Sequence, residues 1–363
     1  MKQNSDKKYP ENISKKEKAK EKEKTLTEIL KMFAPGTSLR SALDDIIGAK
    51  MGALIIIDKE GLNEIIEKGF RINSKFSQQK LVELAKMDGA IILSEDLKKI
   101  LYANSVIYPS IEISSKETGT RHKAAERTSK QLGTIAIAVS ERKNKVTVYY
   151  RGITYELVGS AEILRRAAET LQILEKQREA FDQTITNFNF LEINSCVTVG
   201  DVSELLQRFE IINRISDKVK RYLIELGKEG AIVNMRLKEL TGNISKKEDI
   251  VLEDYFDSNA QQSREILRKM NFDFLLEKSN ISRMLFDELH DRNISPKGIR
   301  ILKKSNLLEK HISQVIEKFG SLDKILSCNE SDLLEALEKK EIAGLFKKEI
   351  EELKEKIMVG KEI

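Results

Sequence analysis

Tryptophan is absent from this chain of 363 residues, which also has only 4 prolines, 3 histidines and 2 cysteines. Aromatic residues make up 6% of the sequence, whereas charged residues make up 33%. This composition indicates a helix-rich protein with modest hydrophobic cores. Cys196 and Cys328 lie far apart and lack the spacing of metal ligands. We therefore expect two reduced thiols in the core of a cytosolic protein.

Long apolar runs are also missing. No run approaches the length of a membrane span, and the N-terminus is charged where a signal peptide needs an apolar segment. We therefore expect a cytoplasmic protein that does not contact a membrane. Most of the formal net charge of +5 lies in the lysine-rich segment 1–24, which we expect to be a disordered or helical tail. The rest is close to neutral, so overall charge does not argue for nucleic acid.

The common nucleotide and metal signatures are absent as well. The sequence contains no G-x-x-x-x-G-K-[ST], no G-x-G-x-x-G after a strand and no H-E-x-x-H. A Ser/His/Asp arrangement is not evident either. The standard nucleotide-binding folds are therefore not indicated.

The pattern of residues 25–159 predicts an α/β domain with a mixed central sheet and flanking helices. Apolar residues at helical spacing predict helices at 25–33, 39–47, 79–87 and 122–131. Continuous apolar runs at 52–58, 89–94 and 133–140 are typical of buried strands. Residues 146–150 alternate in polarity, and we expect them to pair with 155–158 across a turn at Arg151 and Gly152.

The spacing of apolar residues along the sequence changes after this domain. Apolar stripes at helical spacing predict an all-α bundle, a spine, over residues 160–280. Residues 281–363 read as short helices joined by turns, including S-P-K-G-I-R (Ser295 to Arg300). That texture is typical of helix-hairpin-helix domains, which offer backbone N–H groups to DNA phosphates, and a plain small helical domain fits the same letters.

The strongest chemical signal is the stretch Glu117–Lys123 (E-T-G-T-R-H-K). Thr120 follows a glycine, and Arg121, His122 and Lys123 come next at the predicted start of a helix. Backbone N–H groups and cationic side chains thus stand together, which is how proteins hold polyphosphates. Without an anion these groups would repel one another, so we interpret the stretch as a ligand site.

Three further residues stand at strand ends. Asp88 precedes a buried strand, where it could be a turn residue or a carboxylate that binds a metal or takes up a hydroxyl proton. Gly89 beside it would let a ligand approach the backbone. Ser140 ends another apolar strand, where it could cap the next turn or offer its hydroxyl to a phosphate.

Together these motifs resemble the DNA-binding diadenylate cyclases of bacteria, the family of DNA integrity scanning proteins. The matching stretches follow one another in a fixed order: A-P-G-T-S-L-R (Ala34 to Arg40), G-A-L-I-I-I (Gly52 to Ile57), M-D-G-A-I-I-L (Met87 to Leu93), Y-A-N (Tyr102 to Asn104), E-T-G-T-R-H-K-A-A-E-R (Glu117 to Arg127) and I-A-V-S (Ile137 to Ser140). The resemblance extends from about residue 25 to the C-terminus.

The resemblance implies an enzyme that condenses two ATP molecules into cyclic di-AMP and two pyrophosphates across a dimer interface, with Mg²⁺ or Mn²⁺. It implies a homo-octamer and restraint of the cyclase by branched DNA. Asp88, Arg121 and His122 would be catalytic, and Asp88 would also bind the metal. ATP would contact the following residues: Gly89, Ile107, Thr120, Arg121, His122, Lys123, Ala124 and Ser140.

The chain departs from the family pattern in two places. Lys123 replaces an arginine and Ala124 a threonine, which removes a guanidinium and a hydroxyl near the phosphates. The glycine-rich C-terminal hairpin reads L-E-K-K-E-I-A-G here, so DNA binding would depend on a basic patch comprising Lys297, Arg300, Lys303 and Lys304. The alternative is a DNA-binding scaffold or sensor that binds ATP without turnover.

Overall fold

The computed structural model describes residues 28–360, and the predicted tail at 1–24 lies outside this range. The chain divides into two compact units. One comprises the described residues up to Ala168 together with Lys220–Asn234, and the other comprises Glu169–Val219 and the described residues from Met235 onward. Among the described residues, no helix is both long enough and apolar enough to span a bilayer.

The first unit contains an eight-stranded mixed sheet in the order β2-β5-β4-β1-β6-β7-β8, with β3 paired to β5. Only β1 and β4 run parallel, and every other pair is antiparallel. The predicted α/β class and mixed sheet are confirmed. The strands are β1 (Ala53–Ile57), β2 (Ile66–Glu67), β3 (Phe70–Lys75), β4 (Ala90–Leu93), β5 (Lys99–Ile107), β6 (Ile135–Ser140), β7 (Lys145–Tyr150) and β8 (Ile153–Leu157).

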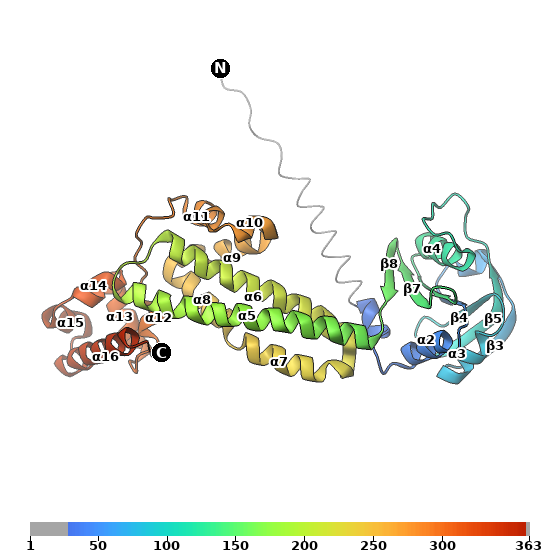
Figure 1. Ribbon diagram of the computed structural model, residues 1–363, viewed down its shortest axis with the longest axis horizontal. Coiled ribbons are helices and arrows are strands. Elements are labelled where there is room, and N and C mark those ends of the chain that lie inside the picture. Colours follow the sequence, from blue (N-terminus) through green and yellow to red (C-terminus); the bar gives the residue numbers. More distant parts are fainter. Residues whose placement is uncertain (1–27, 361–363) are drawn as a thin grey trace, which may run out of the picture. The chain divides into compact units, whose positions relative to one another are not determined.

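Helices cover both faces of this sheet, because successive residues of its central strands point to opposite sides. Ile55 and Ile91 face α2 (Ser38–Gly48) and α3 (Gln78–Leu84) in one hydrophobic cluster. Ile56 and Ile92 lie in a second cluster with Ala125 of α4 (Thr120–Leu132). Figure 1 shows α4 on the opposite side of the strands from α2 and α3. The continuous apolar strands predicted from the sequence are therefore buried on both faces.

The second unit begins with two long helices, α5 (Ser160–Ile193) and α6 (Val199–Leu226), whose first and last turns respectively belong to the first unit. Phe181 and Phe209 pack between them with ring centroids 4.8 Å apart. Shorter helices follow: α7 (Ala231–Thr241), α8 (Ile244–Phe256), α9 (Ala260–Lys269), α10 (Phe272–Leu276) and α11 (Lys278–Phe286). The prediction of an all-α region after the sheet is confirmed.

The C-terminal part consists of five helices around a core that includes Leu302, Val315 and Phe346. They are α12 (Ile299–Leu302), α13 (Glu309–Phe319), α14 (Leu322–Ser327), α15 (Glu330–Leu337) and α16 (Lys340–Met358). Residue 281, the predicted start of this part, lies within α11. Cys196, which we expected in the core, is exposed, and Cys328 is half-buried.

Candidate functional site

Strand register gathers the sequence-predicted residues at one edge of the sheet. Ala90 of β4 lies opposite Leu54 of β1, and Ala53 lies opposite Val139 of β6. Because β1 and β4 are parallel and β6 is antiparallel to β1, the starts of β1 and β4 meet the end of β6. Asp88 and Gly89 precede β4, and Ser140 ends β6, so they share this edge.

Ile107 belongs to the same edge. Ser105 of β5 lies opposite Ala90, and Ile107 ends β5 two residues further on. Its half-buried side chain packs against the cluster beneath α4. The candidate set therefore comes from β4, β5 and β6, which lie within four adjacent strands of the sheet, and from helix α4.

Helix α4 begins at this edge with unpaired backbone donors. Its N-cap is Gly119, which has no side chain to accept a hydrogen bond, and the first intrahelical bond is donated by the Lys123 N–H to the Gly119 carbonyl at 2.9 Å. The N–H groups of Thr120, Arg121 and His122 consequently remain available. Together with the helix dipole they form a site suited to an anion.

Arg121 connects the helix to Asp88. Its Nη2 lies 3.8 Å from the Asp88 Oδ1, and the Asp88 side chain is fully exposed. The guanidinium also lies against Gly52, where a Cβ would meet the Arg121 Nη1 at 2.8 Å. Any side chain at position 52 would displace Arg121. We did not predict Gly52 for the site, although its position directly before an apolar strand could have indicated one.

The His122 ring is half-buried and packs edge-on against Tyr149, with ring centroids 6.3 Å apart. Burial lowers the pKa of His122; the nearby carboxylate of Glu117 opposes this shift, whereas the positive charges of Lys143 and Arg121 add to it. Near neutral pH the imidazole is therefore mainly uncharged. We expected His122 to belong to a cationic cluster. Its neutral ring can instead donate or accept one hydrogen bond.

Tyr149 is fully buried and donates a hydrogen bond of 2.9 Å to the Glu117 carboxylate. Burial, followed by that carboxylate, raises the pKa of the Tyr149 phenol far above its usual value. The phenol therefore stays protonated and holds Glu117 beside His122. Glu117 opens the predicted ligand stretch, but Tyr149 was not predicted for the site, because this contact joins β7 to the loop before α4.

The loop before α4 is held on that helix by charged side chains. Glu126 is buried and accepts hydrogen bonds from Ser115 Oγ at 2.5 Å and from Lys130 Nζ at 2.6 Å. Arg127 Nε donates to the Ile113 carbonyl at 2.9 Å. Burial alone would raise the pKa of Glu126, but these donors keep the pKa below its usual value. The ionised carboxylate thereby fixes the approach to Thr120.

The structure explains the glycine at position 89 differently from what we expected. Its φ is +84°, and a Cβ would lie 2.8 Å from the Ser105 carbonyl oxygen. The missing side chain thus accommodates the backbone of β5. The close approach to a ligand that we predicted is not needed to explain this glycine.

The remaining candidates differ in exposure. Lys123 and Thr120 are exposed at the start of α4. Ala124 is half-buried and packs against the cluster beneath the helix, so its methyl group points toward the sheet. Ser140 Oγ accepts a hydrogen bond of 3.2 Å from the Lys143 N–H, which is the turn cap that we considered for it.

A divalent metal at this edge would have one protein carboxylate. No group of three His, Cys, Asp or Glu side chains gathers anywhere in residues 28–360. Mg²⁺ is commonly bound by one or two carboxylates with substrate phosphates and water completing its shell. The exposed Asp88 fits that donor set, with the phosphates entering at the start of α4.

The DNA-binding candidates are placed differently. Arg300 is only 5% exposed and forms an ion pair with Glu192, while its Nη1 donates to Asn189 Oδ1 at 2.6 Å. Lys297 pairs with Asp257 at 2.7 Å. The expected surface patch is thus divided, because Arg300 points into the protein. Of these four candidates, only Lys303 and Lys304 are exposed and form no ion pair with any described residue.

The backbone N–H groups at the S-P-K-G turn also have an acceptor within the protein. Asp254 of α8 accepts hydrogen bonds from the N–H groups of Gly298, Ile299 and Arg300, at 2.7, 2.9 and 2.9 Å. A carboxylate of the protein itself therefore fills the position where we expected a DNA phosphate. At the other predicted hairpin, Glu338 adopts a φ of +59°, a conformation that favours glycine.

Comparisons with known proteins agree with this architecture. Residues 40–154 match the family model described as DisA bacterial checkpoint controller nucleotide-binding, and residues 157–289 match the model of its linker region. The chain therefore combines a nucleotide-binding domain of the diadenylate cyclase class with the helical linker of the same checkpoint controllers.

Similarity to curated proteins extends over most of the chain. The DNA integrity scanning protein DisA of Acetivibrio thermocellus is 40% identical over 86% of this chain and 90% of its own length. DisA of Clostridium botulinum strain Loch Maree is 39% identical over 94% of this chain and 99% of its own length. This chain belongs to the DisA family. A solved structure of Staphylococcus aureus DacA, a double mutant, is 29% identical over 39% of this chain and 95% of its own, with a TM-score of 0.30.

Proposed function

We propose that this chain is a diadenylate cyclase that condenses two ATP molecules into cyclic di-AMP and two pyrophosphates. The observation that supports this most is the uncapped start of α4, where free N–H groups and Arg121 stand beside the exposed carboxylate of Asp88. A triphosphate needs anion donors, and a sugar hydroxyl about to attack needs a nearby carboxylate or metal. The sheet edge supplies both within one site.

In the proposed reaction the 3′-oxygen of each ATP bonds to the α-phosphorus of the other. The bond from that phosphorus to the bridging oxygen breaks, and pyrophosphate leaves with the electron pair. The hydroxyl proton passes to the Asp88 carboxylate or to water. Arg121 and the N–H groups of Thr120 and His122 hold the triphosphate and offset charge on the leaving group. Mg²⁺ or Mn²⁺, bound by Asp88 and phosphate oxygens, would neutralise further phosphate charge.

One α4 site binds one ATP, so the proposed reaction requires two cyclase domains face to face. We therefore propose a homodimeric pair as the active unit, within an octamer in the cytoplasm. Lys123 and Ser140 would approach the phosphates, and Gly89 and Ile107 the nucleoside. This part of the proposal rests on family membership and on the position of these residues at the same sheet edge.

Mass spectrometry of the product formed from ATP and Mn²⁺ tests the activity directly. We expect cyclic di-AMP from the wild-type protein and about 10³-fold less from Asp88→Asn, which keeps the side-chain shape but removes the charge. Asp88 is fully exposed, so the variant should fold. ATP binding without any cyclic product would refute the cyclase and favour the alternative, a DNA-binding sensor.

We also propose that branched DNA bound by the C-terminal helices regulates the cyclase. The support is the name of the relatives, DNA integrity scanning proteins, and the presence of short helices joined by tight turns at residues 299–358. Adding a four-way junction to the ATP reaction should lower the rate of cyclic di-AMP formation. A linear duplex of equal length is the control, and equal rates with both DNAs would contradict the regulatory proposal.

A further inference from the structure

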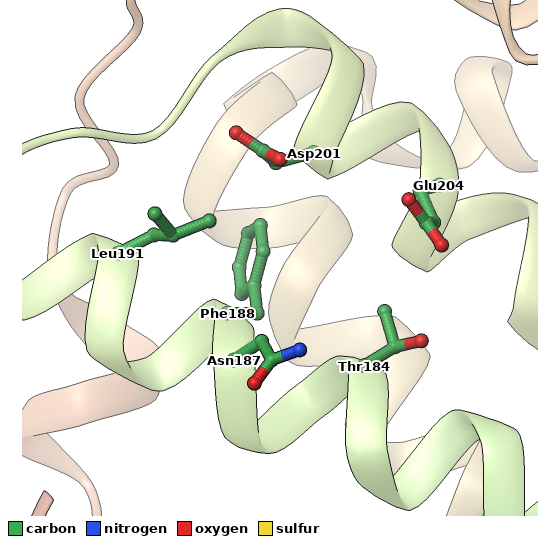
Figure 2. Close-up of a pocket in the computed structure, with 6 residues that line it drawn as sticks. All are labelled: Thr184, Asn187, Phe188, Leu191, Asp201 and Glu204. Carbon is green, nitrogen blue, oxygen red and sulfur yellow. The ribbon is translucent and has the colours of Figure 1, made fainter.

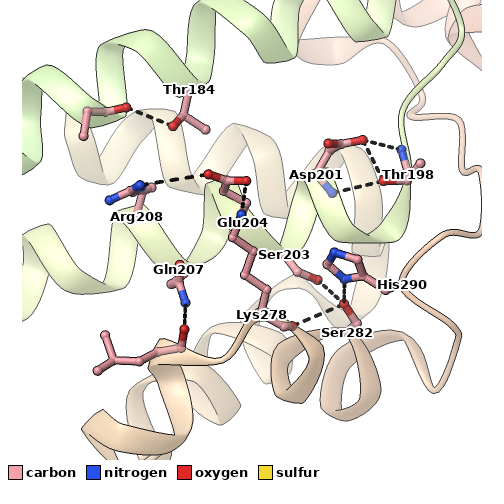
Figure 3. A network of polar contacts seen from close by, with 12 residues as sticks. Thr184, Thr198, Asp201, Ser203, Glu204, Gln207, Arg208, Lys278, Ser282 and His290 are labelled. Atoms are coloured by element: carbon pink, nitrogen blue, oxygen red, sulfur yellow. Dashed lines mark hydrogen bonds and ion pairs between the residues drawn. The ribbon is translucent and has the colours of Figure 1, made fainter.

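The helical unit contains two cavities whose polar linings differ. The smaller, about 200 Å³, is lined by Thr184, Asn187, Phe188, Leu191, Asp201 and Glu204 (Figure 2). Its carboxylates already have partners: Asp201 accepts hydrogen bonds from Thr198, and Glu204 forms an ion pair with Lys278 (Figure 3). The charged groups of this cavity therefore serve the packing of α6 and α11 and leave nothing for a ligand to satisfy.

The larger cavity, about 400 Å³, lies among α5, α8 and the end of α12. Half of its lining residues are basic, and they face a single lining carboxylate, Asp182. The lining comprises Arg178, Asp182, Ile185, Thr186, Asn189, Lys247, Ile250, Arg300, Lys303 and Lys304. A concave space with a large excess of positive charge attracts anions.

Internal partners neutralise only part of that charge. Arg178 Nε binds Asp182 at 2.9 Å, and Arg300 is paired with the buried Glu192. The ammonium group of Lys247 lies 5.9 Å from the Phe181 ring centroid. Lys303 and Lys304 follow α12 directly, and their ammonium groups form no ion pair or hydrogen bond with any described residue. Two lysines in the same cavity thus lack an ion-pair partner among the described residues.

The lowered pKa of Lys304 agrees with this excess of positive charge. The surrounding protein, together with the charges of Arg300 and Lys247, lowers the pKa of Lys304 to about 7, although Glu192 acts in the opposite direction. The Lys304 side chain is exposed to solvent, although it also lines the concave wall of the cavity. Holding cations this close together is unfavourable, and an anion among them would relieve the repulsion.

We propose that this cavity is a binding site for a small phosphate-bearing anion of nucleotide size. Phosphate oxygens would bind Lys303 and Lys304, and the uncharged part of the ligand would lie against Ile185 and Ile250. The volume is within the range of small-molecule sites, whereas a double helix cannot enter it. The phosphates could come from a free nucleotide or polyphosphate, or from the end of a nucleic-acid strand; the small volume of the cavity favours the free compound.

Calorimetric titration of the full-length protein with inorganic tripolyphosphate tests the proposal. Arg121→Ala removes the principal side-chain anion contact at the sheet edge, and variants in the helical unit then test where the binding that persists in this variant takes place. In that background, Lys304→Gln should weaken affinity about tenfold, and adding Lys303→Gln should weaken it about tenfold again. Lys310→Gln, an exposed lysine of α13 outside the cavity lining, is the matched control and should change affinity less than about twofold.

Three results would overturn the proposal. Loss of all tripolyphosphate binding in Arg121→Ala alone would place every anion at the sheet edge. Equal affinities for Lys304→Gln and Lys310→Gln would show that the cavity holds no anion. A double variant that binds a four-way junction more weakly but tripolyphosphate normally would assign these lysines to DNA instead. Circular dichroism of each variant confirms that it is folded.

Discussion

Two turns in this protein resemble each other in sequence but differ in what satisfies them. T-G-T-R-H-K and S-P-K-G-I-R each place a glycine at the N-cap of a helix, with basic residues next to it or in the first turn. At the first, the N–H groups of α4 are free and Arg121 lies 3.8 Å from an exposed aspartate. At the second, the N–H groups bind Asp254, and Arg300 is buried against Glu192.

The difference indicates that a cluster of donors is available to a ligand only when the fold supplies no acceptor. A backbone N–H or guanidinium taken from water must find a partner, because leaving it unpaired costs on the order of 1–3 kcal/mol. In the S-P-K-G turn that partner comes from α8 and α5. At the start of α4 the partner is missing, so an incoming anion can provide it.

Removing Arg121 should produce the largest effect. We expect Arg121→Ala to lower the rate of cyclic di-AMP formation about 10³-fold, because a fixed cation beside the phosphates is lost. Lys123→Ala, an exposed neighbour on the same turn, should lower the rate less than about tenfold. Initial rates at saturating ATP and Mn²⁺ measure both. Similar losses in the two variants would mean that position within the turn does not matter.

At the second turn the charge should matter for stability instead. Glu192→Ala would leave the Arg300 guanidinium buried without its carboxylate, and we expect the free energy of unfolding to fall by about 3–5 kcal/mol. Urea unfolding measures this change.

A double variant, Glu192→Met with Arg300→Met, separates the charge from the packing. It removes both ions and should recover much of the loss. A double variant as unstable as Glu192→Ala would show that the destabilisation came from lost packing. Arg300 would then be no different from any other buried side chain.

Much of the cyclase-type domain was predictable because its signals are local. The apolar runs that became β1, β4 and β6 could be read directly, and the pairing of β7 with β8 followed from the turn between them. Strands β3 and β5 were missed. No residue of β3 is buried, the buried residues of β5 follow no regular alternation, and a register shift interrupts the pairing of the two strands, so no clear period exists.

The site shows the same limit. The Thr120–Lys123 stretch could be predicted because its residues are adjacent in the sequence. Gly52 and Tyr149 contribute through contacts that form only in the folded sheet. Likewise, Arg300 looked like a surface cation because its partner Glu192 lies 108 residues away in the sequence. A sequence shows which donors are present, whereas the fold decides which acceptors reach them.

Asp254→Ala sharpens the comparison by opening the second turn. Three N–H groups at Gly298, Ile299 and Arg300 would lose their acceptor, and we expect the free energy of unfolding to fall by about 2–3 kcal/mol. Asp254→Asn keeps one carbonyl oxygen and should lose about half as much. Urea unfolding gives the energies, and hydrogen exchange at residues 298–300 should accelerate more in the alanine variant. Unchanged exchange would show that the carboxylate does not hold this turn.

The smallest expected effect is the pH dependence contributed by Lys304, whose pKa is about 7 in the folded chain against an ordinary value of 10.5. Between these values the unfolded chain binds more protons than the folded one, so this group makes stability rise with pH above about 7. Below that value both states are charged, and the full cost of burying the ammonium group, together with its repulsion from Arg300 and Lys247, remains. Lys304→Met should therefore stabilise the protein at pH 6.5 and flatten the rise toward pH 9, measured by urea unfolding at each pH, whereas Lys310→Met should do neither. Parallel curves for Lys304→Met and the wild type would mean that neither burial nor the neighbouring cations lower the pKa of Lys304.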